Sequence, residues 1–481
     1  MAKKSYSTQS SVLPWVDVDT PENAHTHKSS RGQTWSLVMS DEFNQEGRTF
    51  EAGADHLWTA IEKPDGVNAA LEIYSINMTS TECDKDDNCY FYIESDIDEK
   101  NLTVWNDYIT PRGFQNVSFY YRAAMVQGWN KFCFQGGLAV LRVQLPGVVD
   151  KDSGNPDLVN ATKDTRAERN TDSKCAESGG STSAASSFMY QLDALSANWG
   201  IHLAAYTDWV TYSVEWVPGD DGYVRWEVEG HPVFEIAAAT VTNPPQDAAQ
   251  MNPRKIMIEE PMYLIFNVAL SSEWGSKPPN AGVSGCYGDG KDKKTNTICD
   301  AFPMKMKIDY IRVYQDTSTM VYGCDPASHP TKQWIEDNID SYQDFDNLVV
   351  RVSGKASCNS DDDCTIASKG VSSVRTGYCN NGRCACASHT WTGPRCTEAT
   401  SVKKDDVQYG PPMSLTIAVA AVVIIATFAS TLYTARNEKR ENERRLKVRA
   451  IEERSKQAGP TSQMSEVNIG PEKTGYSTNF V

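Results

Sequence analysis

The chain has 481 residues, with 46 Lys and Arg against 63 Asp and Glu, so its formal net charge is −17. A surface this acidic repels phosphate backbones, and we therefore expect no nucleic-acid partner. Aromatic residues make up 10 % of the chain, which excludes a mostly disordered protein. The length allows about two to four domains, and 13 Cys indicate an oxidising compartment.

Residues 1–29 read as a polar leader, and residues 30–320 read as a large β domain. The domain contains short apolar runs that are rich in β-branched and aromatic residues and are broken by Gly, Pro and Asn. No long segment with a 3.6-residue period competes with these runs. The pattern predicts an all-β antiparallel sandwich or jelly roll. The clearest predicted strands are 35–39, 116–122, 137–144, 210–216, 263–269 and 308–314.

Six motifs follow one another in this domain. In order they are Ser40-Asp-Glu-Phe43, Tyr121 to Lys131, Gly136 to Pro146, Tyr212 to Trp226, Pro261 to Trp274 and Phe302 to Gln315. The string resembles glycoside hydrolase family 16, and the resemblance covers about residues 33–316. It implies a concanavalin-like β-jelly roll that acts on β-glucans. The stretch from Tyr121 to Phe134 resembles the membrane-anchored branch associated with β-1,6-glucan synthesis.

The resemblance also implies retaining hydrolysis or transglycosylation by two glutamates about 5–5.5 Å apart. The family carries them on one strand as Glu-x-Asp-x-x-Glu, which should follow Pro146 and precede the strand at Val210. Residues 147–187 contain no such motif and no aromatic residue among their 41 residues. We expect an irregular segment there and interpret it as the place where a block of sequence with the catalytic strand is missing. Exon skipping, a gene-model error and genuine loss all remain open as its cause.

One hexad, Glu94-Ser-Asp96-Ile-Asp-Glu99, fits the catalytic pattern. It precedes Tyr121, on the wrong side of two family motifs, and a sequon at Asn101 follows it. A glycan at that position would obstruct a cleft. We interpret the hexad as a chance match, so no catalytic residue is predicted.

The predicted ligand is a β-glucan polysaccharide, and no cofactor or metal is expected. Flat aromatic side chains suit one-sided packing against sugar rings. By resemblance Trp274 faces the cleft, because the family places a Trp after its Asn-Val-Ala strand. Arg122, Trp129 and Asn267 are the other candidate contacts, whereas Trp216 and Trp226 read as core residues.

Sequons and cysteines support exposure of this domain to a secretory compartment. We expect a short disulfide between Cys83 and Cys89 and another between Cys286 and Cys299. Cys133 is expected to have lost its partner together with the missing block. The candidate glycosylation sites are Asn77, Asn101, Asn116 and Asn160.

After a linker at 321–352, residues 353–398 hold six closely spaced cysteines that resemble an EGF-like module. The resemblance implies the pairs Cys358–Cys379, Cys364–Cys384 and Cys386–Cys396. A zinc site is the alternative, but it would need paired Cys-x-x-Cys or His ligands, which His389 alone does not supply. Such a module offers a surface for protein partners.

A stalk at 399–411 leads to an uncharged stretch at 412–435. The 21 residues from Met413 to Tyr433 span about 31 Å as a helix, enough to cross a bilayer. The tail at 436–481 has 10 Lys and Arg against 7 Asp and Glu. The positive-inside rule predicts a single-pass protein with a cytosolic tail and with residues 1–411 outside or in a lumen. This topology fits the plasma membrane or the secretory pathway.

The N-terminus lacks an apolar signal region, so we expect the natural start to lie upstream. The sequence as a whole favours a membrane-anchored protein of cell-wall β-glucan biosynthesis and remodelling, with this chain inactive as a glycosidase or transglycosylase. The alternative is a non-catalytic glucan-binding or adhesion and receptor-like surface protein.

Overall fold

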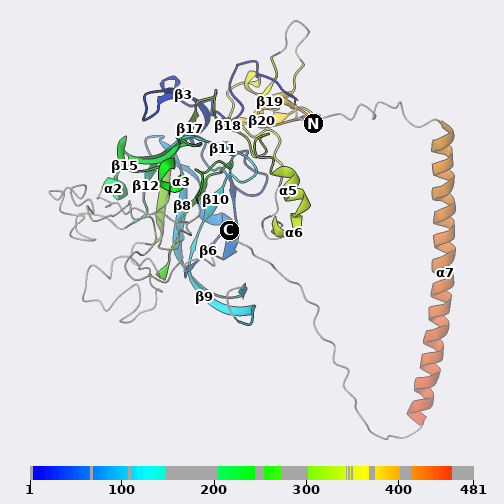
Figure 1. The fold of residues 1–481 in the computed structure, drawn as a ribbon. Coiled ribbons are helices and arrows are strands. Elements are labelled where there is room, and N and C mark those ends of the chain that lie inside the picture. Colours follow the sequence, from blue (N-terminus) through cyan, green and yellow to red (C-terminus); the bar gives the residue numbers. More distant parts are fainter. Residues whose placement is uncertain are drawn as a thin grey trace, which may run out of the picture. The chain divides into compact units, whose positions relative to one another are not determined.

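The computed structural model describes residues 4–64, 69–106, 110–147, 204–243, 254–272, 302–342, 344, 347, 350–367, 374–400 and 413–457 (Figure 1). The expected segment 147–187 lies outside these residues apart from Gly147, and so do Asn160, Trp274, Cys286 and Cys299. The chain contains two compact units. Residues 1–400 belong to the first, and residues 401–476 form the second.

One large, twelve-stranded sheet forms most of the first unit. Its strands follow the order β15-β14-β13-β12-β17-β8-β9-β6-β5, with β2 and β3 attached beside β17 and β7 attached beside β8. All pairs in it are antiparallel except β6 with β9. The strands are β2 (Thr26–Lys28), β3 (Thr34–Asp41), β5 (Lys63–Pro64), β6 (Glu72–Tyr74), β7 (Thr79–Cys83), β8 (Cys89–Asn106), β9 (Gly113–Ala123), β12 (Gly137–Gln144), β13 (Val210–Val217), β14 (Tyr223–Val228), β15 (His231–Ala237) and β17 (Met304–Gln315).

A second, three-stranded sheet packs against the large one. Its order is β16 (Ile265–Asn267), β10 (Met125–Gln127) and β4 (Thr59–Ala60). Val126 and Phe266 of this sheet join Phe91, Ile93 and other side chains of the large sheet in one buried apolar cluster. The prediction of a mostly β, two-layer fold is therefore confirmed. Short helices fill the connections: α2 (Ala204–Thr207), α3 (Ala238–Thr242), α5 (Lys332–Asp337) and α6 (Ile339–Tyr342).

The expectation of a separate polar leader over residues 1–29 is wrong from residue 4 onward, where the structure describes a segment that packs against the rest of the first unit. β1 (Lys4–Ser5) pairs with β22 (Glu398–Ala399) of the small module. Val16 is buried, and Trp15 packs against the main core, because the otherwise polar segment contains one apolar stretch. The N-terminal segment thus links the small module to the large sheets.

The expectation that Cys133 has lost its partner is also wrong, because Cys133 forms a disulfide with Cys324. The backbone explains the pairing: β11 (Phe134–Gln135) runs antiparallel to β18 (Val321–Tyr322), with Phe134 opposite Tyr322. This pairing brings the two cysteines together across 191 positions of sequence. Part of the expected linker is therefore tied to the β-sandwich.

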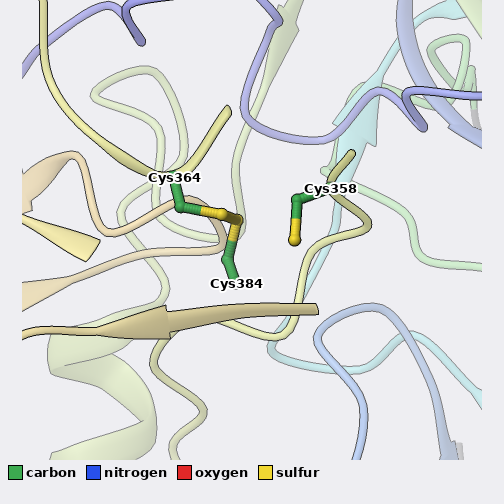
Figure 2. A group of neighbouring side chains, drawn as sticks. All are labelled: Cys358, Cys364 and Cys384. Atoms are coloured by element: carbon green, nitrogen blue, oxygen red, sulfur yellow. A yellow bond between two sulfur atoms is a disulfide. The ribbon is translucent and has the colours of Figure 1, made fainter. Parts of the chain in front are cut away.

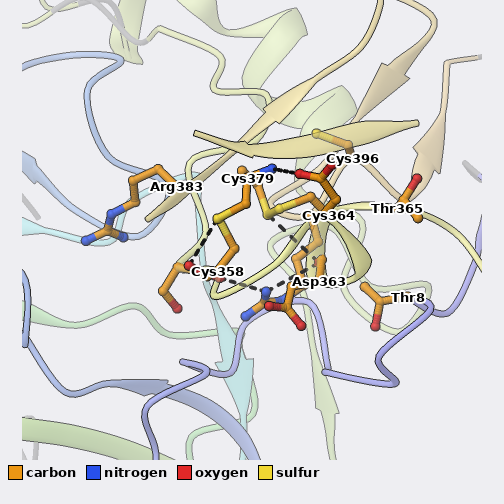
Figure 3. Close-up of a disulfide and its surroundings, with 12 residues drawn as sticks. Thr8, Cys358, Asp363, Cys364, Thr365, Cys379, Arg383 and Cys396 are labelled. Carbon is orange, nitrogen blue, oxygen red and sulfur yellow. Dashed lines mark hydrogen bonds between the residues drawn. A yellow bond between two sulfur atoms is a disulfide. The ribbon is translucent and has the colours of Figure 1, made fainter. Parts of the chain in front are cut away.

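The small module contains short strands and three disulfides, and Figure 3 shows the surroundings of one of these disulfides. They join Cys358 to Cys379, Cys364 to Cys384 and Cys386 to Cys396, the same pairs that the resemblance implies. Cys83 pairs with Cys89 in the large sheet. The strands of the module are β19 (Gly377–Asn380), β20 (Arg383–Cys386), β21 (Trp391–Thr392) and β22.

The second unit contains one long helix, α7 (Met413–Gln457). Within it, Ile417–Arg454 includes a window with a mean hydropathy of 2.1 and no buried residues. Its length and composition suit a membrane anchor.

The Cys133–Cys324 disulfide should stabilise the sandwich more than Cys83–Cys89, since it closes a much longer loop. Chain-entropy scaling from 6 to 191 residues predicts a difference of about 3 kcal/mol in the free energy of unfolding. Urea titration of the full chain in detergent, comparing the two Cys→Ser double variants, measures it. Alkylation of Cys133 and Cys324 as free thiols in the native protein would contradict this pairing.

Candidate functional site

Asn267, a predicted sugar contact, lies on β16, which is an edge strand in the described structure. Its Nδ2 donates to the Tyr74 hydroxyl at 2.9 Å, and that hydroxyl donates to Glu72 Oε1 at 3.1 Å. Asn267 is exposed, whereas Tyr74 and Glu72 are buried. Ile265, two residues earlier on the same face of β16, is exposed and adds apolar surface near the amide. This edge thus offers a polar group on an apolar strip, an arrangement suited to binding.

The buried Glu72 carboxylate was not identified from the sequence. It also accepts a hydrogen bond from the Leu71 backbone N–H at 3.1 Å. A single Glu within an apolar strand matches no catalytic motif, so only the fold reveals its position behind Tyr74. Its contacts hold the Tyr74 hydroxyl in place for Asn267.

Arg122 lies on a different face from the Tyr74 contact. Its strand neighbours Tyr121 and Ala123 are buried in the core, so alternation directs Arg122 to the outer face of the large sheet. There it forms an ion pair with Asp98 at 2.5 Å. The structure therefore does not gather Arg122 and Asn267 into one site.

The Glu94–Glu99 hexad lies on β8, on the same outer face at its start. Glu94 lies 3.8 Å from the Lys305 ammonium, and Asp96 is paired in register with Arg122. A register shift follows Ile97, and Glu99 is exposed. Glu94 and Asp96 thus lie on the side of the sheet away from the core, and Glu99 lies within the irregular stretch that follows them.

Trp129 is half-buried in the turn after β10. Trp274 lies outside the described residues, so its predicted role in the cleft stays a prediction. Trp216 is buried, and its indole N–H donates to the Ile258 carbonyl at 2.9 Å, as suits a core residue.

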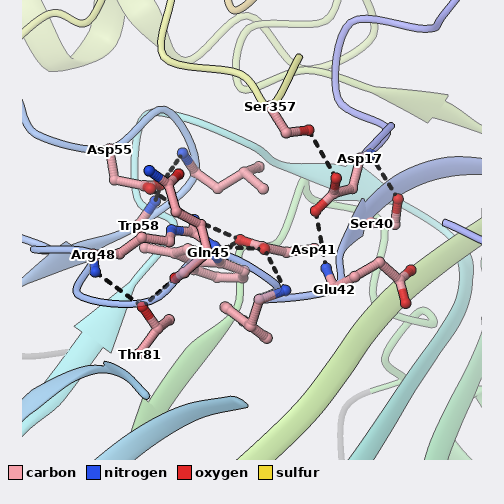
Figure 4. Close-up of polar contacts among 12 residues, drawn as sticks. Asp17, Ser40, Asp41, Glu42, Gln45, Arg48, Asp55, Trp58, Thr81 and Ser357 are labelled. Carbon is pink, nitrogen blue, oxygen red and sulfur yellow. Dashed lines mark hydrogen bonds and ion pairs between the residues drawn. The ribbon is translucent and has the colours of Figure 1, made fainter. Parts of the chain in front are cut away.

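Asp41 of the Ser40-Asp-Glu-Phe43 motif belongs to a buried ionic cluster (Figure 4). Arg48 donates to both oxygens of Asp41 at 2.7 and 2.8 Å and to Asp55 at 2.7 Å. The Trp58 indole N–H donates to Asp41 at 2.8 Å. Burial disfavours the charge on Arg48, but the two carboxylates outweigh this effect and raise its pKa. The cluster connects the end of β3 to the turn before β4.

Two further titratable groups, His56 and Lys131, lie next to this cluster. Burial lowers the pKa of His56 to about 3, more than Asp55 can offset. The His56 ring stacks on Trp15, with centroids 6.2 Å apart. Burial also lowers the pKa of Lys131 to about 8, although its ammonium donates to the backbone carbonyls of Asp55 and Trp58.

The sulfurs of Cys358, Cys364 and Cys384 lie close enough together for a metal site (Figure 2). All three belong to disulfides, so none offers a thiolate. The neighbouring acidic turn is also engaged: Asp363 accepts from the backbone N–H groups of Asn359 and Ser360. Burial opposes the charge on Asp363, yet hydrogen bonds lower its pKa. Asp363 thus forms a capping box with Ser360 at the start of the short 3-10 helix Asp361–Cys364.

A family model and two yeast proteins match this chain in sequence. A family model described as "Beta-glucan synthesis-associated protein SKN1/KRE6/Sbg1" matches residues 2–159 and 160–355. The beta-glucan synthesis-associated protein SKN1 of Saccharomyces cerevisiae is 24 % identical over 425 residues, covering 68 % of this chain and 49 % of SKN1. KRE6 of the same yeast is 24 % identical over 427 residues, covering 68 % and 53 %. The chain spans about half the length of the curated relatives it matches.

Solved glucanase structures show weaker similarity. The endo-beta-1,3-glucanase from Pyrococcus furiosus aligns with a TM-score of 0.36 and 17 % identity, covering 62 % of this chain and 99 % of that chain. The laminarinase catalytic domain from Thermotoga maritima gives 0.34 and 20 %, covering 59 % and 99 %. Because these TM-scores are low, the assignment of the fold depends on the strand pairing described above and not on these structures.

Sheets, disulfides and helix together define a β-sandwich protein with a stapled small module and a long apolar helix that suits a membrane anchor. The chain belongs to the beta-glucan synthesis-associated SKN1/KRE6/Sbg1 family, whose model matches most of the first compact unit. The family match begins at residue 2, so it includes the N-terminal segment that the sequence motifs did not.

Replacing Arg48 by Met should strongly destabilise the sandwich, because Asp41 and Asp55 would stay buried without a counter-ion. The expected loss is about 3–5 kcal/mol in the free energy of unfolding. Arg31→Met is the control: its ion pair with Glu235 is solvent-exposed and should contribute less than about 1 kcal/mol. Equal losses in urea titrations of the two variants would contradict a structural role for the cluster.

His56 should make the fold acid-sensitive. Between pH 6.5 and about 3 the unfolded chain binds a proton that native His56 does not, so stability falls as the pH falls. The slope is about 1.4 kcal/mol per pH unit. His56→Gln should flatten the dependence of the urea midpoint on pH in this range, whereas the exposed His389→Gln should leave it unchanged. An unaltered slope in His56→Gln would disprove the assignment.

Proposed function

We propose that this chain is a membrane-anchored β-glucan-binding protein of cell-wall β-glucan synthesis that has no glycosidase or transglycosylase activity of its own. The observation that carries the proposal is the break in the family match. Its two stretches adjoin in this chain between residues 159 and 160, inside the 147–187 window that lacks the catalytic motif. A catalytic block that is absent there would leave the binding surface without its acid and base.

The length of the alignment supports the same conclusion. The match to SKN1 runs over 425 positions but uses 68 % of 481 residues, about 327, so about 100 positions of that relative have no counterpart here. The hexad at Glu94 does not compensate, because Glu94 lies near Lys305 on the outer face and Glu99 is exposed. A retaining mechanism needs both carboxyl groups to face one sugar.

The binding surface we propose is the β16 edge, with Asn267 as its polar contact and Trp274 following it in the chain. Trp129 is assigned a secondary role, whereas Arg122, which is paired with Asp98 on the outer face of the large sheet, is left out of this surface. Helix α7 would anchor the protein, with residues 1–411 outside the cytosol and the basic tail inside. The small module offers a further surface for protein partners.

The full chain in detergent should bind insoluble β-glucan and release no reducing sugar from laminarin. Asn267→Ala should weaken binding about five-fold or more, since a lost hydrogen bond to a ligand costs about 1 kcal/mol. Gln333→Ala on α5, which removes another surface amide, should have no effect.

Turnover of laminarin would contradict the absence of activity, and its loss in Glu94→Gln would show that the hexad is catalytic. Failure of the full chain to bind any β-glucan would contradict the binding role. These outcomes separate the two halves of the proposal.

A further inference from the structure

The far ends of β8 and β9 form a two-stranded ribbon in the described structure. β17 pairs with β8 only between Phe91 and Ser95. Beyond the register shift, residues 100–106 pair with residues 113–119 of β9 alone. Figure 1 shows β9 continuing past the strands around β17. Isolated two-stranded ribbons are marginally stable in water, so this one needs further support.

Two sequons face each other across this ribbon. Asn101 lies opposite Ser118, and Thr103 lies opposite Asn116. The Thr103 hydroxyl donates to Asn116 Oδ1 at 2.7 Å, and the Ser118 hydroxyl donates to Asn101 Oδ1 at 2.6 Å. Both asparagines are exposed. Each amide oxygen is thus held by the opposite strand, which leaves the Nδ2 atom, the site of glycan attachment, available to solvent.

An aromatic pair continues the same face. Trp105 lies opposite Phe114, and their rings meet edge to face with centroids 5.2 Å apart. Phe114 is 58 % exposed. It precedes Asn116 by two residues, so the two side chains are neighbours on one face of the strand, about 7 Å apart. Asn101 lies on the other side of Asn116 from this pair.

We propose that Asn116 carries an N-linked glycan whose first sugar packs on Phe114 and the edge of Trp105, and that this contact stabilises the ribbon. The inference requires residues 1–411 to pass through the secretory lumen, as proposed above. Covering an exposed aromatic ring with the apolar face of a sugar removes surface from water. Asn101 lies four residues from Trp105 along β8, about 13 Å away, and so beyond the reach of this pair.

Attachment needs a lipid diphosphate-linked oligosaccharide as donor. A bond forms between Nδ2 of Asn116 and C1 of the first sugar, while the bond from C1 to the diphosphate oxygen breaks. The amide nitrogen loses one proton to solvent, and the lipid diphosphate departs with the electron pair of the broken bond. No oxidant or reductant takes part.

The test uses the full chain, directed by a cleavable signal peptide into the secretory pathway of a eukaryotic host. Glycopeptide mass spectrometry should find Asn116 occupied. Hydrogen exchange of residues 100–119 should be about three-fold faster in Asn116→Gln, as expected for the loss of one aromatic contact. Asn77→Gln, which removes a sequon elsewhere, should leave this exchange unchanged.

Two further measurements isolate the contact from the hydrogen bond at Asn116. An endoglycosidase that leaves the first sugar in place should not alter exchange in the ribbon. Phe114→Ala should speed exchange in the glycosylated protein and add little in the Asn116→Gln background. Additive effects of the two variants would overturn the proposal. So would an unoccupied Asn116 beside an occupied Asn77, whereas the glucan-binding assay described above tests the proposed function separately.

Discussion

The buried Arg48 guanidinium, bound by Asp41 and Asp55, is the interaction on which the sandwich depends. Asp41 is the last residue of β3 in the large sheet. Asp55 accepts hydrogen bonds from the backbone N–H groups of Leu57 and Trp58, just before β4 in the small sheet. A charge taken out of water is tolerated only when it is paired. Both terminal nitrogens of Arg48 donate to carboxylates, whereas its Nε has no partner among the described residues. The cluster therefore fixes how the two sheets meet and where Trp58 enters the core.

A second buried arginine connects the small module to the N-terminal segment. Arg395 is fully buried and donates to the carbonyl oxygens of Leu13, Val16 and Ser357. Asp17 completes the connection: it accepts from the Ser357 hydroxyl at 2.8 Å and from the Glu42 backbone N–H at 3.1 Å. Since Glu42 follows Asp41 in the chain, Asp17 links the module to the segment that carries the ionic cluster. The stapled module is thus part of the folded body rather than a free stalk.

Local pattern predicted much of this fold, and long-range contacts account for what it missed. The runs 137–144 and 210–216 became β12 and β13, because alternating apolar residues signal strands without reference to distant sequence. The Cys133–Cys324 pair and the packing of Val16 depend on partners far away in the chain, which no local pattern encodes. At the candidate site Asn267 was found by its motif, but Glu72 was not, since its role arises only where Tyr74 meets β16.

The central claim is that this polypeptide lacks the strand that would carry the acid and base. Peptide mapping of the protein isolated from its own cells, covering residues 145–212 with complete mass assignment, tests this claim most directly. The account predicts that Pro146 leads through the printed sequence to Val210 with no additional residues. An inserted block containing Trp-Pro and Glu-x-Asp-x-x-Glu would contradict it and return the protein to the catalytic class.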